Sequence, residues 1–345
     1  MRWTALPDPR FALHGLPWVE ENSGELWRLP GERSRRLPER VQQLMRFPAG
    51  GRIRFGCSTS KLAIRLRAGP GAHRGNMSDI GARGLDVYAD GTYWNSAAIT
   101  EQGEQEKLLF SEADRAPREI TIYLPLYQEV RVLQIGMDEE ASPVPARPFA
   151  LPAPLVLYGS SIAQGCGACR PGMSYLAIMA RRLDIDFVNL GFSGSGKGER
   201  EVVSLVSALR ACCFLFDLGK SYGRQPESVY SEMLDAVRSQ HPETPLVCIT
   251  PIFANRELYS SEYRDLSEYV RGVVRTAVSR RRAARDPLVH LVEGLELLGP
   301  EDADCYHEAI HPTDLGYARL AERLGARMRD ILHLPVPQGG APRRP

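Results

Sequence analysis

The amino-acid sequence predicts an α/β protein in two parts, an all-β sandwich followed by a three-layer α/β/α domain with a parallel sheet. Residues 1–142 hold short segments in which apolar and polar residues alternate, the period of a half-buried strand. From residue 155 to 334, apolar strands alternate with amphipathic helices. Prolines crowd into the intervening segment 143–154, which predicts an extended linker. The tail, 335–345, is rich in proline, glycine and arginine and is predicted to be disordered.

The first part is predicted to be a sandwich with a jelly-roll-like arrangement, because it holds several short strands and few helical stretches. Asp90-Gly91 between two strand segments is a hairpin-turn signal. Strands are predicted at 52–57, 61–67, 85–88, 93–94, 119–124 and 130–135.

The second part is predicted to form a parallel sheet covered by helices on both faces. Ligands of such sheets bind beyond the carboxyl ends of the strands. Strands are predicted at 155–158, 187–190, 213–217, 246–250 and 289–292. Helices are predicted at 173–183, 199–209, 226–240, 261–281 and 314–332.

Composition restricts the possible partners. The 345 residues carry a net charge of +1, with 43% hydrophobic and 25% charged residues. No basic excess points to nucleic acid, and no window approaches the ~18 apolar residues of a membrane span. The N-terminus lacks the apolar stretch of a secretory signal, and seven cysteines are an odd, irregularly spaced set. A cytoplasmic protein without a disulfide framework is therefore expected, and its oligomeric state stays open.

Ser161 is the candidate nucleophile. It follows the apolar strand 155–158 and the turn Gly159-Ser160, so a rigid strand positions it and the turn exposes its hydroxyl. A serine hydroxyl is a weak nucleophile at neutral pH and needs a base within hydrogen-bond reach. The sequence therefore has to supply a histidine at the same edge of the sheet.

His311 is the candidate base, and Glu308 is the candidate acid that orients it. The two residues are three apart on a predicted loop, a spacing that can bring a carboxylate to imidazole Nδ1. Thr313 is expected to cap the helix that begins near residue 314. A rival pair, Asp304 and His307, has the same spacing, and Asp304 is an alternative acid for His311.

Ser161 early in the domain and the block Glu308-Ala-Ile-His311-Pro-Thr-Asp-Leu-Gly-Tyr near its end resemble the SGNH (GDSL-type) serine hydrolase superfamily. The resemblance implies a flavodoxin-like fold and, in two-domain members, an N-terminal jelly-roll-like domain. Glutamate stands here where the family usually has aspartate. The resemblance implies oxyanion donors at Ser161 N–H, at Gly191 and at Ser221, and Ser221 occupies the position of the family's asparagine. It implies no metal or cofactor.

Two further motifs resemble known binding motifs, one for phosphate and one for zinc, but each lacks a residue that the motif requires. Gly191–Gly198 nearly matches a phosphate-binding loop, but Gly198 replaces the Ser or Thr that such a loop uses for Mg²⁺. Cys166 and Cys169 form a C-x-x-C without a second ligand pair, so two small residues in a tight loop are favoured over zinc.

The resemblance implies a serine esterase that removes a short acyl group from a sugar or natural-product scaffold through an acyl-enzyme on Ser161. The partner is then a small-molecule ester or acylated carbohydrate. One alternative is an acyltransferase that uses the same residues. Another is a carbohydrate-binding protein with a degenerate hydrolase domain, since the oxyanion asparagine is missing.

Overall fold

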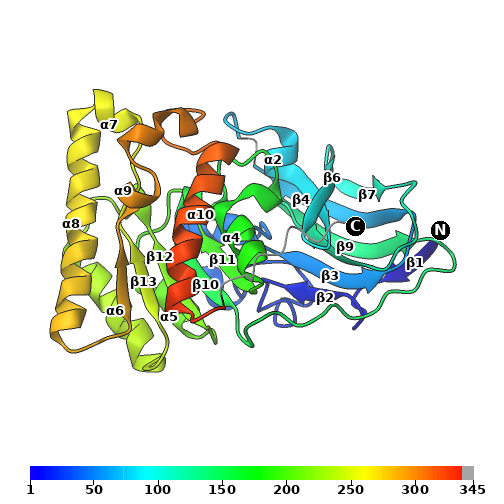
Figure 1. Cartoon of the computed structure of the whole chain (residues 1–345), viewed down its shortest axis with the longest axis horizontal. Coiled ribbons are helices and arrows are strands. Elements are labelled where there is room, and N and C mark those ends of the chain that lie inside the picture. Colours follow the sequence, from blue (N-terminus) through cyan, green and yellow to red (C-terminus); the bar gives the residue numbers. More distant parts are fainter. Residues whose placement is uncertain (73, 336–345) are drawn as a thin grey trace.

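The structure is a computed structural model that describes residues 1–72 and 74–335. Figure 1 shows β sheets at the N-terminal end of the molecule and a layered α/β/α arrangement at the other. After Pro335, the tail that was predicted to be disordered lies outside the described residues. The predicted fold class is confirmed: a parallel sheet with flanking helices follows antiparallel sheets.

The N-terminal part contains two antiparallel sheets, and the predicted strands are confirmed within one to four residues at their ends. The first sheet has the order β1 (Arg2–Ala5), β9 (Gln128–Met137), β4 (Leu62–Gly71) and β7 (Gly103–Phe110). The second has the order β2 (Ala12–His14), β3 (Arg52–Cys57), β8 (Arg118–Tyr123), β5 (Gly84–Ala89) and β6 (Thr92–Ala98). The jelly-roll-like connectivity stays a prediction.

Three strands were missed, each for a physical reason. β1 and β2 are too short for an alternation to show. β7 is an edge strand in which only Leu109 and Phe110 are buried, and its other side chains are largely charged or amide groups. Edge strands commonly carry such residues, which discourage pairing with other chains.

Both sheets contribute to one hydrophobic core. Ile53 of β3 and Ile120 of β8 face Ile64 of β4 and Ile135 of β9 in this core, and all four side chains are fully buried. This is sandwich packing, in which the inner faces of two sheets bury alternate residues of each strand.

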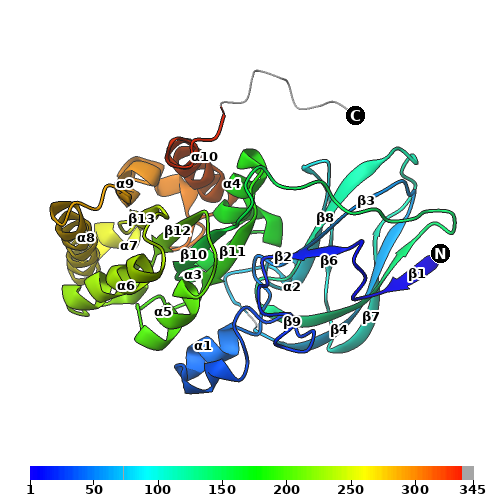
Figure 2. The same ribbon diagram turned by 90° about the horizontal axis from the view of Figure 1, so that it is seen from below.

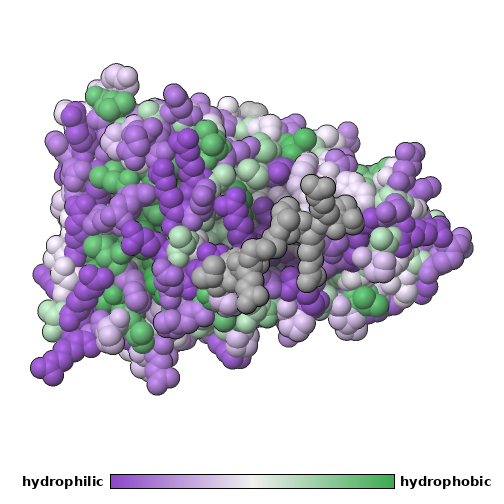
Figure 3. Space-filling model, in the orientation of Figure 1, coloured by the Kyte–Doolittle hydropathy of each residue, from purple (hydrophilic) through white to green (hydrophobic). Residues whose placement is uncertain are grey.

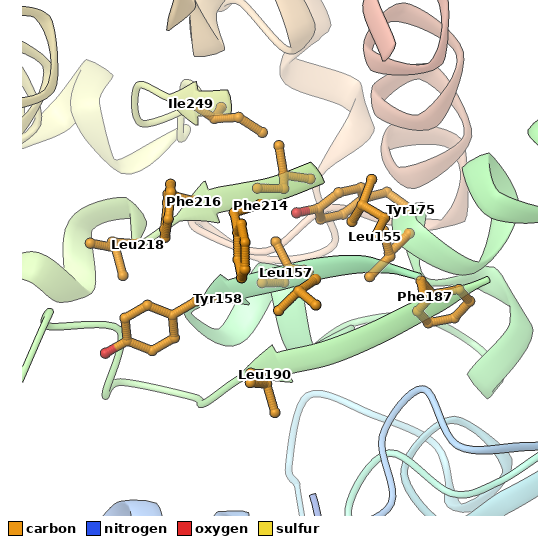
Figure 4. Packing of buried hydrophobic residues seen from close by; sticks show 14 of the residues in the cluster. Leu155, Leu157, Tyr158, Tyr175, Phe187, Leu190, Phe214, Phe216, Leu218 and Ile249 are labelled. Carbon is orange, nitrogen blue, oxygen red and sulfur yellow. The ribbon is translucent and has the colours of Figure 1, made fainter. Parts of the chain in front are cut away.

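The parallel sheet has the order β11 (Phe187–Gly191), β10 (Leu155–Gly159), β12 (Cys213–Asp217), β13 (Leu246–Ile249) and β14 (Val289–Val292). This is the flavodoxin-like order. Figure 4 shows apolar side chains of the three strands β10, β11 and β12 packed with Tyr175.

The flanking helices are α3 (Ser161–Gln164), α4 (Tyr175–Leu183), α5 (Arg200–Ser207), α6 (Glu227–Gln240), α7 (Arg256–Tyr259), α8 (Ser261–Ala283), α9 (Gly294–Leu297) and α10 (Asp314–Ile331). The five predicted helices are confirmed as α4, α5, α6, α8 and α10. The missed helices α3, α7 and α9 have four residues each, too few for a helical period to appear.

Short helices of the N-terminal part are η1 (Arg33–Arg36), α1 (Glu39–Leu44) and α2 (Asp79–Arg83). Val41 and Leu44 of α1 are fully buried and belong to the core of the α/β/α part. Figure 2 accordingly shows α1 beside that part and apart from the two β sheets. Residues from the two parts therefore share one continuous core.

Arg28 is fully buried at this junction. Its guanidinium donates to the carbonyls of Leu44 (2.8 Å) and Phe47 (2.7 Å) on one side. On the other side it donates to the carbonyls of Asn189 (3.1 Å) and Gly191 (2.5 Å), at the end of β11. Burial lowers the pKa of Arg28 to about 9, and the carbonyls satisfy its donors. The contact fixes the N-terminal part against the strand end beside the candidate nucleophile.

The predicted linker 143–154 runs without a helix or strand, and Val144 pairs with Gly56 of β3 through two main-chain hydrogen bonds of 2.8 Å. On the face of the molecule shown in Figure 3, hydrophobic residues are scattered singly or in small groups among hydrophilic ones. Scattering of this kind is normal for a protein surface.

Candidate active site

Ser161 is the first residue of α3, and a single residue, Ser160, separates it from the end of β10. The turn requires glycine at position 159, because a Cβ there would lie 2.5 Å from the Asp217 carbonyl oxygen. The same carbonyl accepts the N–H of Ser160 at 3.0 Å, which ties the turn to β12. The Ser161 N–H lies at the first position of a helix, where it has no intrahelical acceptor.

The structure brings His311 and Glu308 to Ser161. His311 Nε2 is 2.9 Å from Ser161 Oγ, and His311 Nδ1 is hydrogen-bonded to Glu308 Oε1. Glu308 also accepts the main-chain N–H groups of Ile310 and His311, both at 3.1 Å. These bonds fold the longer glutamate side chain back onto its own loop, where it reaches the position expected for an aspartate. The three side chains thus form a continuous hydrogen-bonded chain.

The loop that carries His311 is fixed at its base. Tyr306 and Pro312 form an isolated antiparallel bridge, and the Thr313 N–H donates to the Cys305 carbonyl at 2.7 Å. The Thr313 side chain accepts the N–H of Gly316 at 3.4 Å, so the predicted cap of α10 is confirmed. A loop held at both ends keeps the imidazole in one orientation.

Asp304, the alternative acid predicted from the sequence, does not contact His311. Asp304 is exposed, and no hydrogen bond or ion pair joins its carboxylate to His311 among the described residues. His307 is exposed too and makes a main-chain bond of 3.3 Å to the His311 carbonyl. Of the two candidate acids, Glu308 is therefore the one whose carboxylate contacts His311.

Cys166 is a neighbour of His311 that the sequence analysis treated only as a small loop residue. Its sulfur is buried and accepts a hydrogen bond from Arg74 Nη2 at 3.0 Å. Burial raises the pKa of this thiol, but His311 and Arg74 outweigh burial and lower the pKa to about 7. The available sequence signal was its place five residues after Ser161, in the turn that follows the short helix α3.

The charges around His311 favour its protonated form. Burial acts against protonation, but Cys166 and Glu308 outweigh it and raise the pKa of His311 above its ordinary value. Burial likewise raises the pKa of Glu308, but its bonds to His311 outweigh burial and lower that pKa. An ionised Glu308 stabilises the imidazolium that forms when the serine loses its proton.

The hydrogen bond that the Gly191 N–H makes in this structure does not support its predicted oxyanion role. Its N–H is buried and donates to Asn189 Oδ1 at 2.8 Å, so it is unavailable to a substrate. Gly194, three residues on, lines the same cavity as Ser161 and is exposed. Its φ of +75° is a conformation that favours glycine. The available sequence signal for Gly194 is that it is a second glycine in the loop after β11.

The cavity around Ser161 has a volume of about 410 Å³. Ser221, which follows β12, lines it beside Gly194 and His311. Two residues of the N-terminal part, Arg40 of α1 and Arg74, also line it. The remaining lining residues are Ser160, Ile162, Ser193, Asp217, Gly219, Lys220, Pro251, Ile252, Tyr263, Leu266 and Ile310.

The residues that the structure describes contain no group of three or more His, Cys, Asp or Glu side chains arranged to hold a metal ion. Every one of the seven cysteines falls within them, and all seven thiols are free. Among the described helices, none combines the length and apolar character needed to cross a bilayer.

Comparison with known families matches both parts of the chain. Residues 152–329 match the GDSL-like lipase/acylhydrolase family, and residues 1–142 match the N-terminus of SGNH-hydrolase-type esterases, the GxDLY family. The segment Gly84-Leu-Asp-Val-Tyr88 of β5 agrees with the letters of that second family's name except that Val87 stands in place of leucine. The chain therefore belongs to the GDSL-like lipase/acylhydrolase family, and it is a serine esterase or acyl hydrolase of the SGNH type.

Solved structures agree with this assignment. A GDSL-like lipase of Bacteroides ovatus is 26% identical, with a TM-score of 0.85 over 97% of this chain and 99% of that one. A salicylyl-acyltransferase from a tetracycline biosynthetic pathway is 21% identical, with a TM-score of 0.83 over 96% and 97%. A family two carbohydrate esterase of Cellvibrio japonicus is 14% identical, with a TM-score of 0.62 over 96% and 98%. The last two show likeness of fold alone. No curated protein matches the chain.

Proposed function

We propose that this protein hydrolyses an ester of a short acyl group on a sugar or natural-product scaffold, through an acyl-enzyme on Ser161. The observation that carries the proposal is the 2.9 Å contact between Ser161 Oγ and His311 Nε2, with Glu308 on the other ring nitrogen. Neutral histidine in this tautomer accepts the serine proton at Nε2 while Nδ1–H donates to the carboxylate.

In the first half-reaction, Ser161 Oγ bonds to the ester carbonyl carbon as its proton passes to His311 Nε2. The resulting oxyanion accepts hydrogen bonds from the Ser161 N–H, the Gly194 N–H and the Ser221 hydroxyl in this proposal. Each such donor typically contributes about 3 kcal/mol to transition-state stabilisation. The C–O bond to the alcohol then breaks, and His311 returns the proton to the leaving oxygen.

In the second half-reaction, His311 takes a proton from water, and the hydroxide attacks the acyl carbon. Collapse of the second tetrahedral intermediate releases the carboxylic acid and restores Ser161 with the proton from His311. The steps use only side chains, main-chain N–H groups and water. The carbohydrate esterases among the fold neighbours support an acylated sugar as one substrate class.

The test is hydrolysis of p-nitrophenyl acetate by the purified protein. Wild type is expected to release nitrophenol, and Ser161→Ala is expected to lose at least about 10³-fold in kcat. Ser204→Ala, which removes an exposed serine of α5, is the matched control and should keep wild-type activity. Equal activity in Ser161→Ala and wild type would exclude the proposed nucleophile, and an inactive wild type would favour the binding-protein alternative.

Acyl transfer to an alcohol is a second candidate, because the N-terminal part walls the cavity and the fold neighbours include an acyltransferase. The same acyl-enzyme would then be resolved by an alcohol in place of water. Adding acceptor alcohols and measuring the ratio of transesterified to hydrolysed product separates the two activities. A ratio that rises in proportion to the alcohol concentration, without saturation, would identify a hydrolase that has no binding site for the acceptor alcohol.

A further inference from the structure

Two arginines of the N-terminal part enter the catalytic cavity. Arg40 lies on α1, and Arg74 lies between β4 and α2, yet both line the cavity that holds Ser161 and His311. Neither residue belongs to the hydrogen-bonded chain of serine, histidine and glutamate. Their presence gives one wall of the cavity two positive charges that the proposed chemistry does not use.

The carboxylates near the cavity are engaged elsewhere. Asp217 accepts the Tyr175 hydroxyl at 2.9 Å and is buried. Glu257 pairs with Lys220 at 2.9 Å, which neutralises the third cation of the lining, and Glu308 is bonded to His311. Within residues 1–72 and 74–335, no ion pair joins a carboxylate to Arg40 or Arg74. The residues outside that part of the chain include no Asp or Glu.

Among the described residues, Arg74 contacts the Cys166 sulfur and an aromatic ring, and its guanidinium forms no ion pair with a carboxylate. One Nη donates to the Cys166 sulfur at 3.0 Å, and the guanidinium lies 4.7 Å from the centre of the Tyr127 ring. Its Nε is buried and has no hydrogen-bond partner among the described residues. A buried donor without a partner is unfavourable, and Arg74 would gain a hydrogen bond at Nε if its guanidinium turned toward an acceptor in the cavity.

Guanidinium groups bind carboxylates and phosphates through two parallel N–H···O bonds. We propose that Arg40 and Arg74 form an oxoanion subsite in the catalytic cavity, so that the substrate carries a carboxylate or phosphate group in addition to its ester. The cavity of about 410 Å³ suits a small scaffold that bears both groups. This inference rests on the proposed esterase function and narrows its substrate class to anionic esters.

The kinetic test compares two acetyl esters that differ only in charge, 4-acetoxyphenylacetate and 4-acetoxyphenylacetamide. Their phenol leaving groups are alike, so the ratio of their kcat/KM values reports recognition of the carboxylate. Wild type is expected to prefer the anionic ester by about tenfold or more. Arg74→Gln and Arg40→Gln are each expected to lower that ratio by several-fold, and the double variant to abolish the preference.

The matched control is Arg36→Gln, which removes an exposed arginine of η1 that does not line the cavity. It changes the net charge equally and is expected to keep the wild-type ratio. Arg74→Lys keeps the positive charge but loses the paired N–H donors of the guanidinium, and it is expected to give an intermediate ratio. A wild-type ratio near one, or a ratio that none of the cavity variants lowers, would overturn the inference while leaving the esterase proposal intact.

A binding experiment tests the subsite without turnover. Ser161→Ala is titrated calorimetrically with 4-hydroxyphenylacetate, with its amide, and with 4-hydroxybenzylphosphonate. The two anions are expected to bind and the amide is not, and the tighter anion identifies carboxylate or phosphate as the preferred group. Loss of anion binding in Ser161→Ala/Arg74→Gln supports the subsite even if the wild type hydrolyses no ester. Equal heats for anion and amide would contradict it.

Discussion

The two walls of the catalytic cavity differ in how their residues are held. On the α/β/α side, Ser161 begins α3 and His311 lies on a loop fixed just before α10, and His311 is hydrogen-bonded to both Ser161 and Glu308. On the N-terminal side, Arg40 and Arg74 come from a six-residue helix and a connecting segment, and no carboxylate of the described chain pairs with them. We infer that the first wall performs the chemistry and that the second selects the substrate.

The largest expected effect lies on the catalytic wall. Glu308→Gln removes the carboxylate that orients His311 and stabilises its cation, and it is expected to lower kcat by about 10³–10⁴-fold. The assay is hydrolysis of p-nitrophenyl acetate. Asp304→Asn is the matched control and should retain activity, because Asp304 is exposed and apart from the imidazole. A larger loss in Asp304→Asn than in Glu308→Gln would reverse the assignment of the acid.

The oxyanion donors are expected to give the next effect. Ser221→Ala removes the side-chain donor from the cavity and should lower kcat by about ten- to a hundredfold with little change in KM. Ser221→Asn offers a longer donor in its place and is expected to keep or raise kcat. An unchanged kcat in Ser221→Ala would remove Ser221 from the oxyanion site.

The junction between the two walls provides a stability prediction. Asp86 of the Gly-Leu-Asp-Val-Tyr motif is fully buried and accepts the Gly172 N–H at 2.7 Å and the Ser96 hydroxyl at 2.8 Å. Asp86→Ala leaves the buried Gly172 N–H without a partner and removes one of the two partners of the Ser96 hydroxyl, so it is expected to lower the free energy of unfolding by about 2–3 kcal/mol.

Urea unfolding of Asp86→Ala and Asp86→Asn measures this contribution. The asparagine variant keeps an acceptor oxygen at the same position and should lose less than the alanine variant. Equal stabilities of wild type and Asp86→Ala would show that the motif does not join the two parts of the chain.

The smallest effect is a shift in pH dependence. The pKa of His311 is raised above its ordinary value, so the neutral base accumulates, and kcat/KM rises, only as pH passes above that pKa. Cys166 contributes to the raised pKa, and Cys166→Ser removes the ionisable thiol. The acid limb of the pH profile is therefore expected to move to lower pH in Cys166→Ser. A limb that stays in place or moves to higher pH would contradict this electrostatic role.

The sequence predicted the elements and residues that local patterns determine. The five parallel strands, the five longer helices and the cap at Thr313 follow from periodicity and capping chemistry, and the structure confirms them. Ser161 could be nominated because it follows a predicted strand, and His311 because it lies three residues after Glu308 and just before a predicted helix. The short strands β1 and β2 and the four-residue helices could not be predicted from the sequence, because their formation depends on tertiary contacts.

Residues that matter through distant contacts were beyond sequence reasoning. Arg74 reaches Cys166 across 92 positions of the chain, and nothing around either residue signals the other. The free main-chain donor in the loop after β11 could not be predicted from sequence for a related reason. Which glycine N–H is free depends on the Asn189 side chain, whose amide occupies one of them.

The most direct measurement of the central claim is covalent labelling with a fluorophosphonate, followed by intact-mass analysis and peptide mapping. The account predicts a single adduct per chain on Ser161, formed rapidly in wild type and far more slowly in Glu308→Gln. A label carried by another residue while Ser161 stays unmodified would contradict it.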